Sequence, residues 1–388
     1  MSRRAALAAG LLLVGLGLRM VNYTTTPAWG SNRDELAWAW AGQSLIEQHS
    51  PSSWSYLPAY PKVATQLTSD GWPLPLVSPW FDHPPTFAAL VGAVAIAGGQ
   101  NQPGQVDAHY IRLVPILLSL LAAYLAFLLT RRHLDNVTAF LALTLLCISP
   151  WAVEASRLVE SEWLLAPTLL GALLLLEMDG RRAMVGLVAL CLIAPTVKVP
   201  GIAIGVACAV VLASRHRWKV SFACGAAAAG GIGLFVGYGA LIDWHQFVAV
   251  WRAHSDLRAP GLGAILATGN AWLTGATAGL GRVPKDIGPF LALGDPLWVI
   301  GLLGLGLLAL RHPLSPLVVA TVVFAAVIAT TADPVWSPNY AWYRVAVYPL
   351  AYIGVADLVA RSLPEFSRLR RQVGNSQSFR CSHVIVEG

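Results

Sequence analysis

The sequence predicts an all-α membrane protein, a polytopic helical bundle of about ten transmembrane helices with juxtamembrane helices in outer loops 1 and 4. Hydrophobic residues make up 56% and charged residues only 12% of the chain of 388 residues, and the mean hydropathy is +0.60. A soluble chain could not bury so much apolar surface. The net charge of +6 comes from short Arg and Lys clusters between apolar runs. Such clusters are typical of cytoplasmic membrane-protein loops and not of a nucleic-acid-binding patch.

The apolar runs have lengths near the roughly 17–25 residues that a membrane-spanning helix needs, with some shorter. They lie at 5–22, 110–130, 134–150, 163–178, 183–197, 200–214, 220–242, 290–310, 314–332 and 343–360. The basic clusters between them are Arg3-Arg4, Arg131-Arg132, Arg181-Arg182, Arg215 to Lys219, Arg311, and Arg361 with the arginines that follow it. When every cluster is placed in the cytoplasm, all these crossings are consistent and both termini are cytoplasmic.

The apolar run 86–98 is the exception. It has only about 13 residues, so as a helix it would be about 20 Å long against a hydrocarbon core of about 30 Å. If it crossed the membrane, every later basic cluster would face outside. We therefore predict a juxtamembrane helix that belongs to the first outer loop, with Pro84-Pro85 in its first turn.

This topology divides the chain into four segments. Residues 1–242 form a transmembrane core that includes outer loop 1 (23–109), and residues 243–289 form outer loop 4. Residues 290–371 hold the C-terminal transmembrane helices, and 372–388 form a flexible tail. Four of the five cysteines lie in or beside apolar runs and none forms a C-x-x-C pair, so we expect neither disulfides nor a zinc site.

Two acidic motifs fall in the predicted first outer loop. Asp34 and Glu35 follow the first span, at the start of a predicted helix. They are either first-turn acids favoured by the helix dipole or a carboxylate base held at the outer membrane surface. Asp82 and His83 precede the two prolines and either cap an interfacial helix or contribute to a site.

Two further outer turns carry isolated charges. Arg157 could form a salt-bridged turn with Glu154 or Glu160, each three residues away, which leaves Glu162 at the mouth of the next span. Lys198 lies between prolines in an apolar setting. An ionisable group there is a functional candidate, and the alternative is a lysine that snorkels to the interface.

The last two candidates are arginines. Arg258 is one of several Arg and His residues of outer loop 4 that could hold a lipid phosphate, and Arg344 lies among aromatic residues at the outer mouth of the last span. An aromatic interface belt with a terminal arginine would explain Arg344 equally well. Because the topology puts all these acids and bases on one face, they could hold an anionic lipid headgroup beside a carboxylate base.

The order of these motifs resembles a known family. An Asp-Glu pair after the first span, the His-Pro-Pro motif at 83–85, Ser156-Arg157 followed by an acid, and Lys198 in K-x-P-G are similar to motifs of the membrane-embedded C-type glycosyltransferases. The protein O-mannosyltransferase and aminoarabinose transferase branch is the most similar. The resemblance covers about residues 1–260, and the family's usual second-loop Asp is Glu162 here.

The resemblance implies an activity and a set of roles. The family transfers a sugar from a polyprenyl-phosphate carrier to an acceptor hydroxyl outside the cytoplasm. The implied catalytic residues are Asp34, the base of a single inverting displacement, and Glu35 beside it. Implied phosphate-binding residues are His83, Lys198, Arg258 and Arg344, and implied acceptor- or sugar-positioning residues are Asp82, Arg157 and Glu162. The expected partners are the lipid-linked donor and a lipid, polysaccharide or protein acceptor, with no nucleic acid.

Some alternatives stay open. A polysaccharide ligase or polymerase with a lipid-pyrophosphate donor, or a lipid-linked sugar transporter, would also carry charges at membrane depth, although a transporter favours inverted repeats that are not visible here. A divalent cation is compatible with the acidic motifs, but side chains alone could meet the phosphate charge, so no metal is predicted. The residue usage and short loops favour the bacterial cytoplasmic membrane, with the site facing outside.

Overall fold

The fold is known from a computed structural model, which describes residues 3–30, 32–61, 66–69, 72–257, 295–331 and 344–362. Most of these residues are helical. The helices are α1 (Arg3–Met20), α2 (Asp34–Gln48), α3 (Thr86–Ala97), α4 (Ala108–Ile111), α5 (Leu113–His133), α6 (Asn136–Ile148), α7 (Pro150–Ala155), α8 (Glu162–Leu176), α9 (Arg181–Val197), α10 (Ile202–Ser214), α11 (Trp218–Leu257), α14 (Pro296–Arg311), α15 (Pro316–Thr331) and α16 (Tyr348–Ser362). Short 3₁₀ helices η1 (Pro103–Gln105) and η2 (Val199–Gly201) complete the helical elements.

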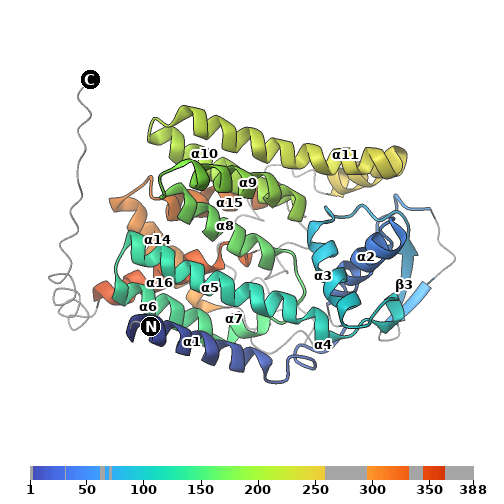
Figure 1. The fold of residues 1–388 in the computed structure, drawn as a ribbon, viewed down its shortest axis with the longest axis horizontal. Helices are drawn as coiled ribbons and strands as arrows, with labels where there is room; N and C mark the ends of the chain where they lie inside the picture. The colour runs from blue at the N-terminus through green and yellow to red at the C-terminus, as the bar shows by residue number, and fades with distance from the viewer. Residues whose placement is uncertain are drawn as a thin grey trace.

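The long helices lie side by side in a bundle, and α2, α3 and three strands lie together at one end of it (Figure 1). The strands are β1 (Ser53–Trp54), β2 (Gln66–Ser69) and β3 (Trp72–Val77), which form an antiparallel sheet in the order β1-β3-β2. The sequence predicted only helices, and for this segment that prediction was wrong. The prolines of β3 exclude a helix there, and extended chain is the conformation they favour.

The number of membrane crossings is not confirmed. Among the described residues, two helical stretches are long and apolar enough to span a membrane, 108–133 and 218–256, and several apolar helices of 10–17 residues accompany them. Helix α11 kinks at Asp243, where φ is −160° and ψ is 98°, next to the predicted end of a span at residue 242. Most of outer loop 4 and the tail 372–388 lie outside the described residues.

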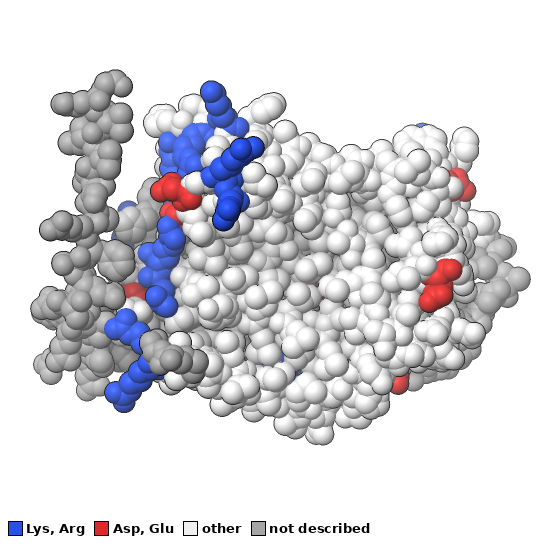
Figure 2. Space-filling view, in the orientation of Figure 1, with Lys and Arg blue, Asp and Glu red and all other residues white. Residues whose placement is uncertain are grey.

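Basic residues gather at the end of the molecule opposite α2, α3 and the sheet (Figure 2). At the end of α8, Glu177 accepts hydrogen bonds from Arg132 at the end of α5 and from Arg215 after α10. Arg361 donates to Asp357 at 2.8 Å, and Arg311 lies 4.0 Å from the same carboxylate. Between the two ends, the face in Figure 2 has a broad belt almost without charged residues. This distribution fits a membrane protein whose basic clusters share one side.

The α2–α3 unit is held by close helix packing. A Cβ on Gly42 would overlap the backbone carbonyl of Ala88, and a Cβ on Gly92 would overlap the backbone of Gly42, so only glycine allows the helices to approach this closely. Trp38, 1% exposed, packs edge-on against Phe87 with ring centroids 5.2 Å apart. The run predicted as a juxtamembrane helix is therefore packed on α2, the first helix of the loop predicted to lie outside.

Gly42→Ala should push α2 away from α3 and destabilise the protein by about 1–3 kcal/mol, the usual cost of an overpacked core. Differential scanning fluorimetry of the purified full-length protein in detergent would measure the shift in unfolding midpoint. The matched control is Gly17→Ala on α1, where a Cβ would meet no atom within 4 Å. An unfolding midpoint of Gly42→Ala equal to that of the control would contradict the packing argument.

Candidate functional site

Four segments that are distant in the sequence meet beside the N-terminus of α2. They are the first turn of α2, the turn that precedes α8, the break between α9 and α10, and the chain that leads into α3. Each carries polar residues that the sequence singled out, and hydrogen bonds or ion pairs join the segments to one another.

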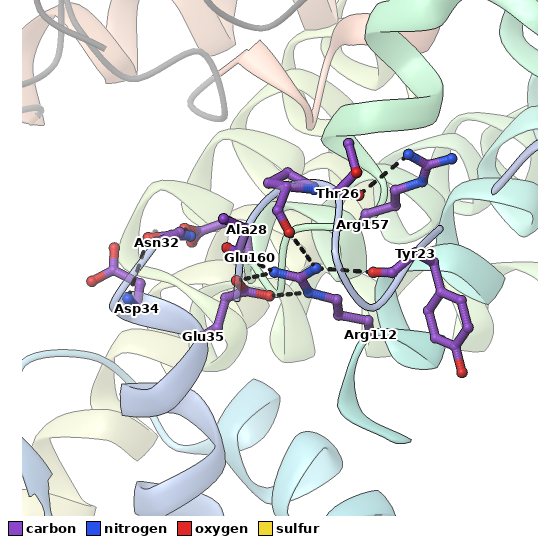
Figure 3. A network of polar contacts seen from close by, with 10 residues as sticks. Tyr23, Thr26, Ala28, Asn32, Asp34, Glu35, Arg112, Arg157 and Glu160 are labelled. Carbon is purple, nitrogen blue, oxygen red and sulfur yellow. Dashed lines mark hydrogen bonds and ion pairs between the residues drawn. The ribbon is translucent and has the colours of Figure 1, made fainter. Parts of the chain in front are cut away.

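Glu35 anchors the first turn of α2. Its carboxylate accepts two hydrogen bonds from Arg112, from Nε to Oε2 and from Nη2 to Oε1, both at 2.8 Å, and both side chains are fully buried. The same guanidinium donates to the backbone carbonyls of Tyr23 at 2.9 Å and Pro27 at 2.8 Å. Figure 3 shows this network with the carboxylate of Asp34 turned away from Arg112.

Burial raises the pKa of Glu35, and the charge of Arg112 opposes that shift. A bidentate guanidinium–carboxylate pair is both strong and geometrically specific. The carboxylate of Glu35 therefore holds the chain before α2 against the start of α5. This is a structural role, and it comes in addition to the catalytic role that the sequence predicts for Glu35.

The turn before α8 and the first residue of α8 bring two more carboxylates to the same place. Glu160 and Glu162 are 1% and 3% exposed. The side chain of Asn32 joins two segments. Its Nδ2 donates to Glu160 Oε1 at 2.5 Å, and its Oδ1 accepts from the backbone N–H of Asp34 at 3.2 Å. Burial, then the negative charges of Asp34 and Glu162, raise the pKa of Glu160 well above its usual value.

Lys198 reaches this cluster from the break between α9 and α10. Its backbone is extended (φ −158°, ψ 140°), and the chain then turns through η2, where a Cβ on Gly201 would overlap the carbonyl of Ala194. The Lys198 ammonium donates to Glu162 Oε1 at 2.6 Å, and both side chains are almost completely buried. The prolines and glycine of this segment thus interrupt the helices and present the lysine.

Asp34 is the partly exposed member of this group, whereas Asn32, Glu160, Glu162 and Lys198 are all buried. Burial raises the pKa of Asp34 to about 6; the positive charge of Lys198 opposes this shift, and the negative charges of Glu162 and Glu35 add to it. A carboxylate with such a pKa is ionised near neutral pH and is a stronger base than an ordinary aspartate. The arrangement therefore suits proton removal from an incoming molecule.

The segment before α3 contacts an aromatic ring of α2 and two hydroxyl groups of the chain between α2 and α3. His83 stacks on Trp38, with ring centroids 4.9 Å apart and an interplanar angle of 20°. Asp82 accepts hydrogen bonds from Ser55 and Tyr60, both at 2.7 Å. Thr86, at the start of α3, donates to Thr196 Oγ1 at 2.9 Å. This bond joins the His-Pro-Pro segment to the α9–α10 break that carries Lys198.

Two predicted site residues lie elsewhere. Arg157 donates to the backbone carbonyls of Leu18, Arg19 and Thr26 at 2.8–3.2 Å, so it holds the end of α1. The charge of Glu154, one of the two partners that helical spacing indicates, also acts on it. Arg344 is 6% exposed and lies over the ring of Trp298, 5.8 Å from its centroid.

The side chains of Tyr348 and Asp295 interact electrostatically with the guanidinium of Arg344. The described contacts of Arg344 therefore place it in a second polar group near the starts of α14 and α16. Arg258 lies outside the described residues.

Sequence reasoning missed Arg112 and Glu160. Arg112 stands alone at the outer mouth of a predicted span, where the positive-inside rule disfavours arginine, and this signal could have identified it. Helical spacing indicates Glu160 only as one of two possible salt-bridge partners of Arg157. Its true partner, Asn32, is 128 positions away in the chain, and no local pattern indicates such a contact.

The described residues contain no group of three or more His, Cys, Asp or Glu side chains arranged to hold a metal ion. The acids closest to such an arrangement, Asp34, Glu160 and Glu162, share their space with the ammonium of Lys198 and the amide of Asn32. As arranged here, these residues do not fit a divalent cation.

Comparison with known families finds one match. Residues 82–238 match the family described as dolichyl-phosphate-mannose-protein mannosyltransferase. No curated protein matches the chain. The resemblance drawn from the sequence, to the C-type glycosyltransferases of the protein O-mannosyltransferase and aminoarabinose transferase branch, is confirmed.

Solved structures share the fold. The oligosaccharyltransferase of Archaeoglobus fulgidus in its apo form matches with a TM-score of 0.56 and 15% identity over 96% of this chain and 52% of that one. ArnT from Cupriavidus metallidurans bound to undecaprenyl phosphate matches with a TM-score of 0.52 and 16% identity over 95% of this chain and 62% of that one. The archaeal enzyme has also been solved with Zn and sulfate. The chain thus spans about half to three fifths of the length of these proteins.

The Glu35–Arg112 pair can be tested by a double-mutant cycle. Glu35→Gln or Arg112→Met should each destabilise the protein by about 3–5 kcal/mol, because each leaves a buried partner uncompensated, whereas the double variant should recover part of the loss. The unfolding midpoint in detergent measures all three. The control is Arg215→Met, which removes a partly exposed Arg–Glu pair and should cost less than about 1 kcal/mol. Equal effects of Arg112→Met and Arg215→Met would show that the buried pair is not the anchor.

Proposed function

We propose that this chain, which has the C-type glycosyltransferase fold and the mannosyltransferase family pattern over residues 82–238, transfers a single sugar from a polyprenyl-phosphate donor to an acceptor hydroxyl. The observation that carries the proposal is one partly exposed carboxylate, Asp34, in a buried group of charges. In this proposal the active site faces the extracytoplasmic side and both termini are cytoplasmic.

The reaction is a single displacement. Asp34 takes the proton of the acceptor hydroxyl while that oxygen attacks the anomeric carbon, and the bond between the anomeric carbon and the phosphate oxygen breaks. The polyprenyl phosphate leaves with the bonding electrons, the configuration inverts, and the proton stays on Asp34. Help of this kind from a general base is typically worth about 10²–10⁴ in rate.

The leaving phosphate needs a cation near the base. Lys198 is the ammonium whose charge acts on Asp34, and an ammonium has three N–H donors, so it can bind Glu162 and also face a phosphate oxygen. His83 is joined to the same region through the Thr86–Thr196 hydrogen bond. We assign the phosphate to the side of the site where these two segments meet, with Arg258 as the loop 4 candidate. Preplaced positive charge is worth most in a site that excludes water.

The other predicted residues receive supporting roles in this proposal. Glu162 holds the ammonium of Lys198, and Asp82 fixes the His-Pro-Pro segment through its two hydroxyl donors. Arg157 supports the site from outside by binding the carbonyl of Arg19 at the end of α1 and that of Thr26 in the chain that leads to α2. Arg344 is proposed to contribute positive potential from its place near α14.

Asp34→Asn should lower transfer by about 10²–10⁴-fold and leave the unfolding midpoint close to that of the wild type. The assay measures transfer of a radiolabelled sugar from a polyprenyl-phosphate donor into product by purified protein in detergent. A parallel reaction uses a lipid-pyrophosphate donor. The control is Asp179→Asn, an exposed aspartate on the loop after α8. Near-normal turnover of Asp34→Asn would rule out Asp34 as the base, and turnover with the pyrophosphate donor alone would favour a ligase.

The pH dependence follows from the pKa of Asp34. Since that pKa is raised from 3.8 to about 6, the base is ionised above this value and protonated below it. We expect kcat/KM to fall tenfold per pH unit below about pH 6 and to level off above it. A pH–rate profile of the wild type measures this. An unchanged kcat/KM down to about pH 4.5, roughly one and a half units below the pKa of Asp34, would contradict the assignment of Asp34 as the base.

A further inference from the structure

The candidate site holds more acidic groups than cations. Asp34, Glu160 and Glu162 bring three carboxylates together from two elements, and Lys198 brings one ammonium from a third. Lys198 acts electrostatically on both Asp34 and Glu160 and donates directly to Glu162 at 2.6 Å. Arg112 is committed to Glu35, so it does not neutralise this group.

Three of the carboxylate oxygens of this group, two on Glu162 and one on Glu160, already accept hydrogen bonds. Glu162 Oε1 accepts from Lys198, and Glu162 Oε2 accepts from the Ser161 hydroxyl at 3.2 Å. Glu160 Oε1 accepts from the amide of Asn32. A divalent cation would need several of these oxygens as ligands at short range, and it would have to displace the ammonium from Glu162.

We propose that the Lys198 ammonium is the resident cation of this carboxylate group and takes the place of a divalent metal ion. The inference rests on the proposed function, since it concerns the same site. It goes further by assigning the enzyme to metal-independent sugar transfer. Lys198 is a catalytic residue in this view only where it faces the donor phosphate; toward Asp34 and Glu162 it is a positioning residue.

A tethered ammonium and a metal ion differ in what they do to the base. A divalent ion bound to Asp34 would occupy its lone pairs and lower its basicity, because a metal ion is usually the largest charge in its site. A single ammonium that binds Glu162 holds the acids together and leaves Asp34 able to accept a proton. The segment that carries Lys198 is fixed by close backbone packing at Gly201 and by the Thr86–Thr196 bond, so the cation is built into the fold.

The first test uses the wild type alone. The purified full-length protein is treated with EDTA, and transfer from the lipid-phosphate donor and binding of Mn²⁺ by electron paramagnetic resonance are both measured. We expect transfer to be unchanged by EDTA and no stoichiometric bound Mn²⁺. Loss of transfer in EDTA with recovery on addition of Mn²⁺ or Mg²⁺ would overturn the proposal, and so would one tightly bound Mn²⁺ per chain in the wild type.

The second test removes the ammonium. Lys198→Gln should lower transfer by about 10²–10³-fold and should create a Mn²⁺ site, because three acids then lack their cation; Lys198→Arg should keep more activity and bind no Mn²⁺. The gained Mn²⁺ signal should disappear when Glu162→Gln is added. Lys219→Gln, an exposed lysine at the start of α11, is the control. A folded Lys198→Gln protein that transfers at the wild-type rate and binds no Mn²⁺ would overturn the proposal.

The two readouts separate this inference from the proposed function. If no lipid-phosphate sugar is turned over under any condition, the proposed function fails, and the Mn²⁺ measurements on the wild type still decide whether Lys198 is the resident cation. If transfer occurs and depends on a metal, the proposed function stands and this inference fails.

Discussion

The buried pair between Arg112 and Glu35 is the interaction on which the rest of the site depends. One guanidinium neutralises the acid beside Asp34 and binds backbone carbonyls of the segment that leads into α2. Removing two charges from water is costly, and geometry as good as this is what offsets the cost. Because the pair fixes the first turn of α2, it also fixes the direction of the Asp34 side chain, which Figure 3 shows facing away from it.

That constraint explains how the fold tolerates several acids in one place. Two unit charges 4 Å apart interact by about 4 kcal/mol at an effective dielectric constant of 20, so an uncompensated set of acids would oppose folding. Three compensations are visible. Arg112 serves Glu35, Lys198 serves Glu162, and the raised pKa of Glu160 favours its neutral form. The negative charge of Asp34 is only partly balanced by Lys198, and its side chain is partly exposed. Both properties suit a carboxylate that accepts a proton.

The mostly helical class and several residues of the candidate site could be predicted from the sequence, because both depend on local patterns. Apolar runs and basic pairs indicate a helical membrane protein, and charged residues in apolar surroundings are few enough to stand out, as Asp34, Glu162 and Lys198 did. The pairings could not be predicted. Glu35 and Arg112 are 77 positions apart, and Lys198 and Glu162 are 36 apart, so tertiary packing decides them. Helical spacing indicated Glu154 or Glu160 as the partner of Arg157; the charge of Glu154 does act on Arg157, but the spacing gave no sign of its hydrogen bonds to the carbonyls at the end of α1.

The contact between α3 and the α9–α10 break shows why the short helix 86–97 matters to the chemistry. Gly42 and Gly92 bring α3 close to α2, and Thr86 then joins α3 to Thr196, two residues before Lys198. Asp34 on α2 and Lys198 after α9 are therefore connected through α3 as well as through Glu160 and Glu162. A shift of α3 along α2 would change the separation between Asp34 and Lys198, and catalysis is sensitive to displacements of about 1 Å. The glycine pair that allows the two helices to pack is thus part of the site's geometry, although neither glycine has a side chain to contribute to it.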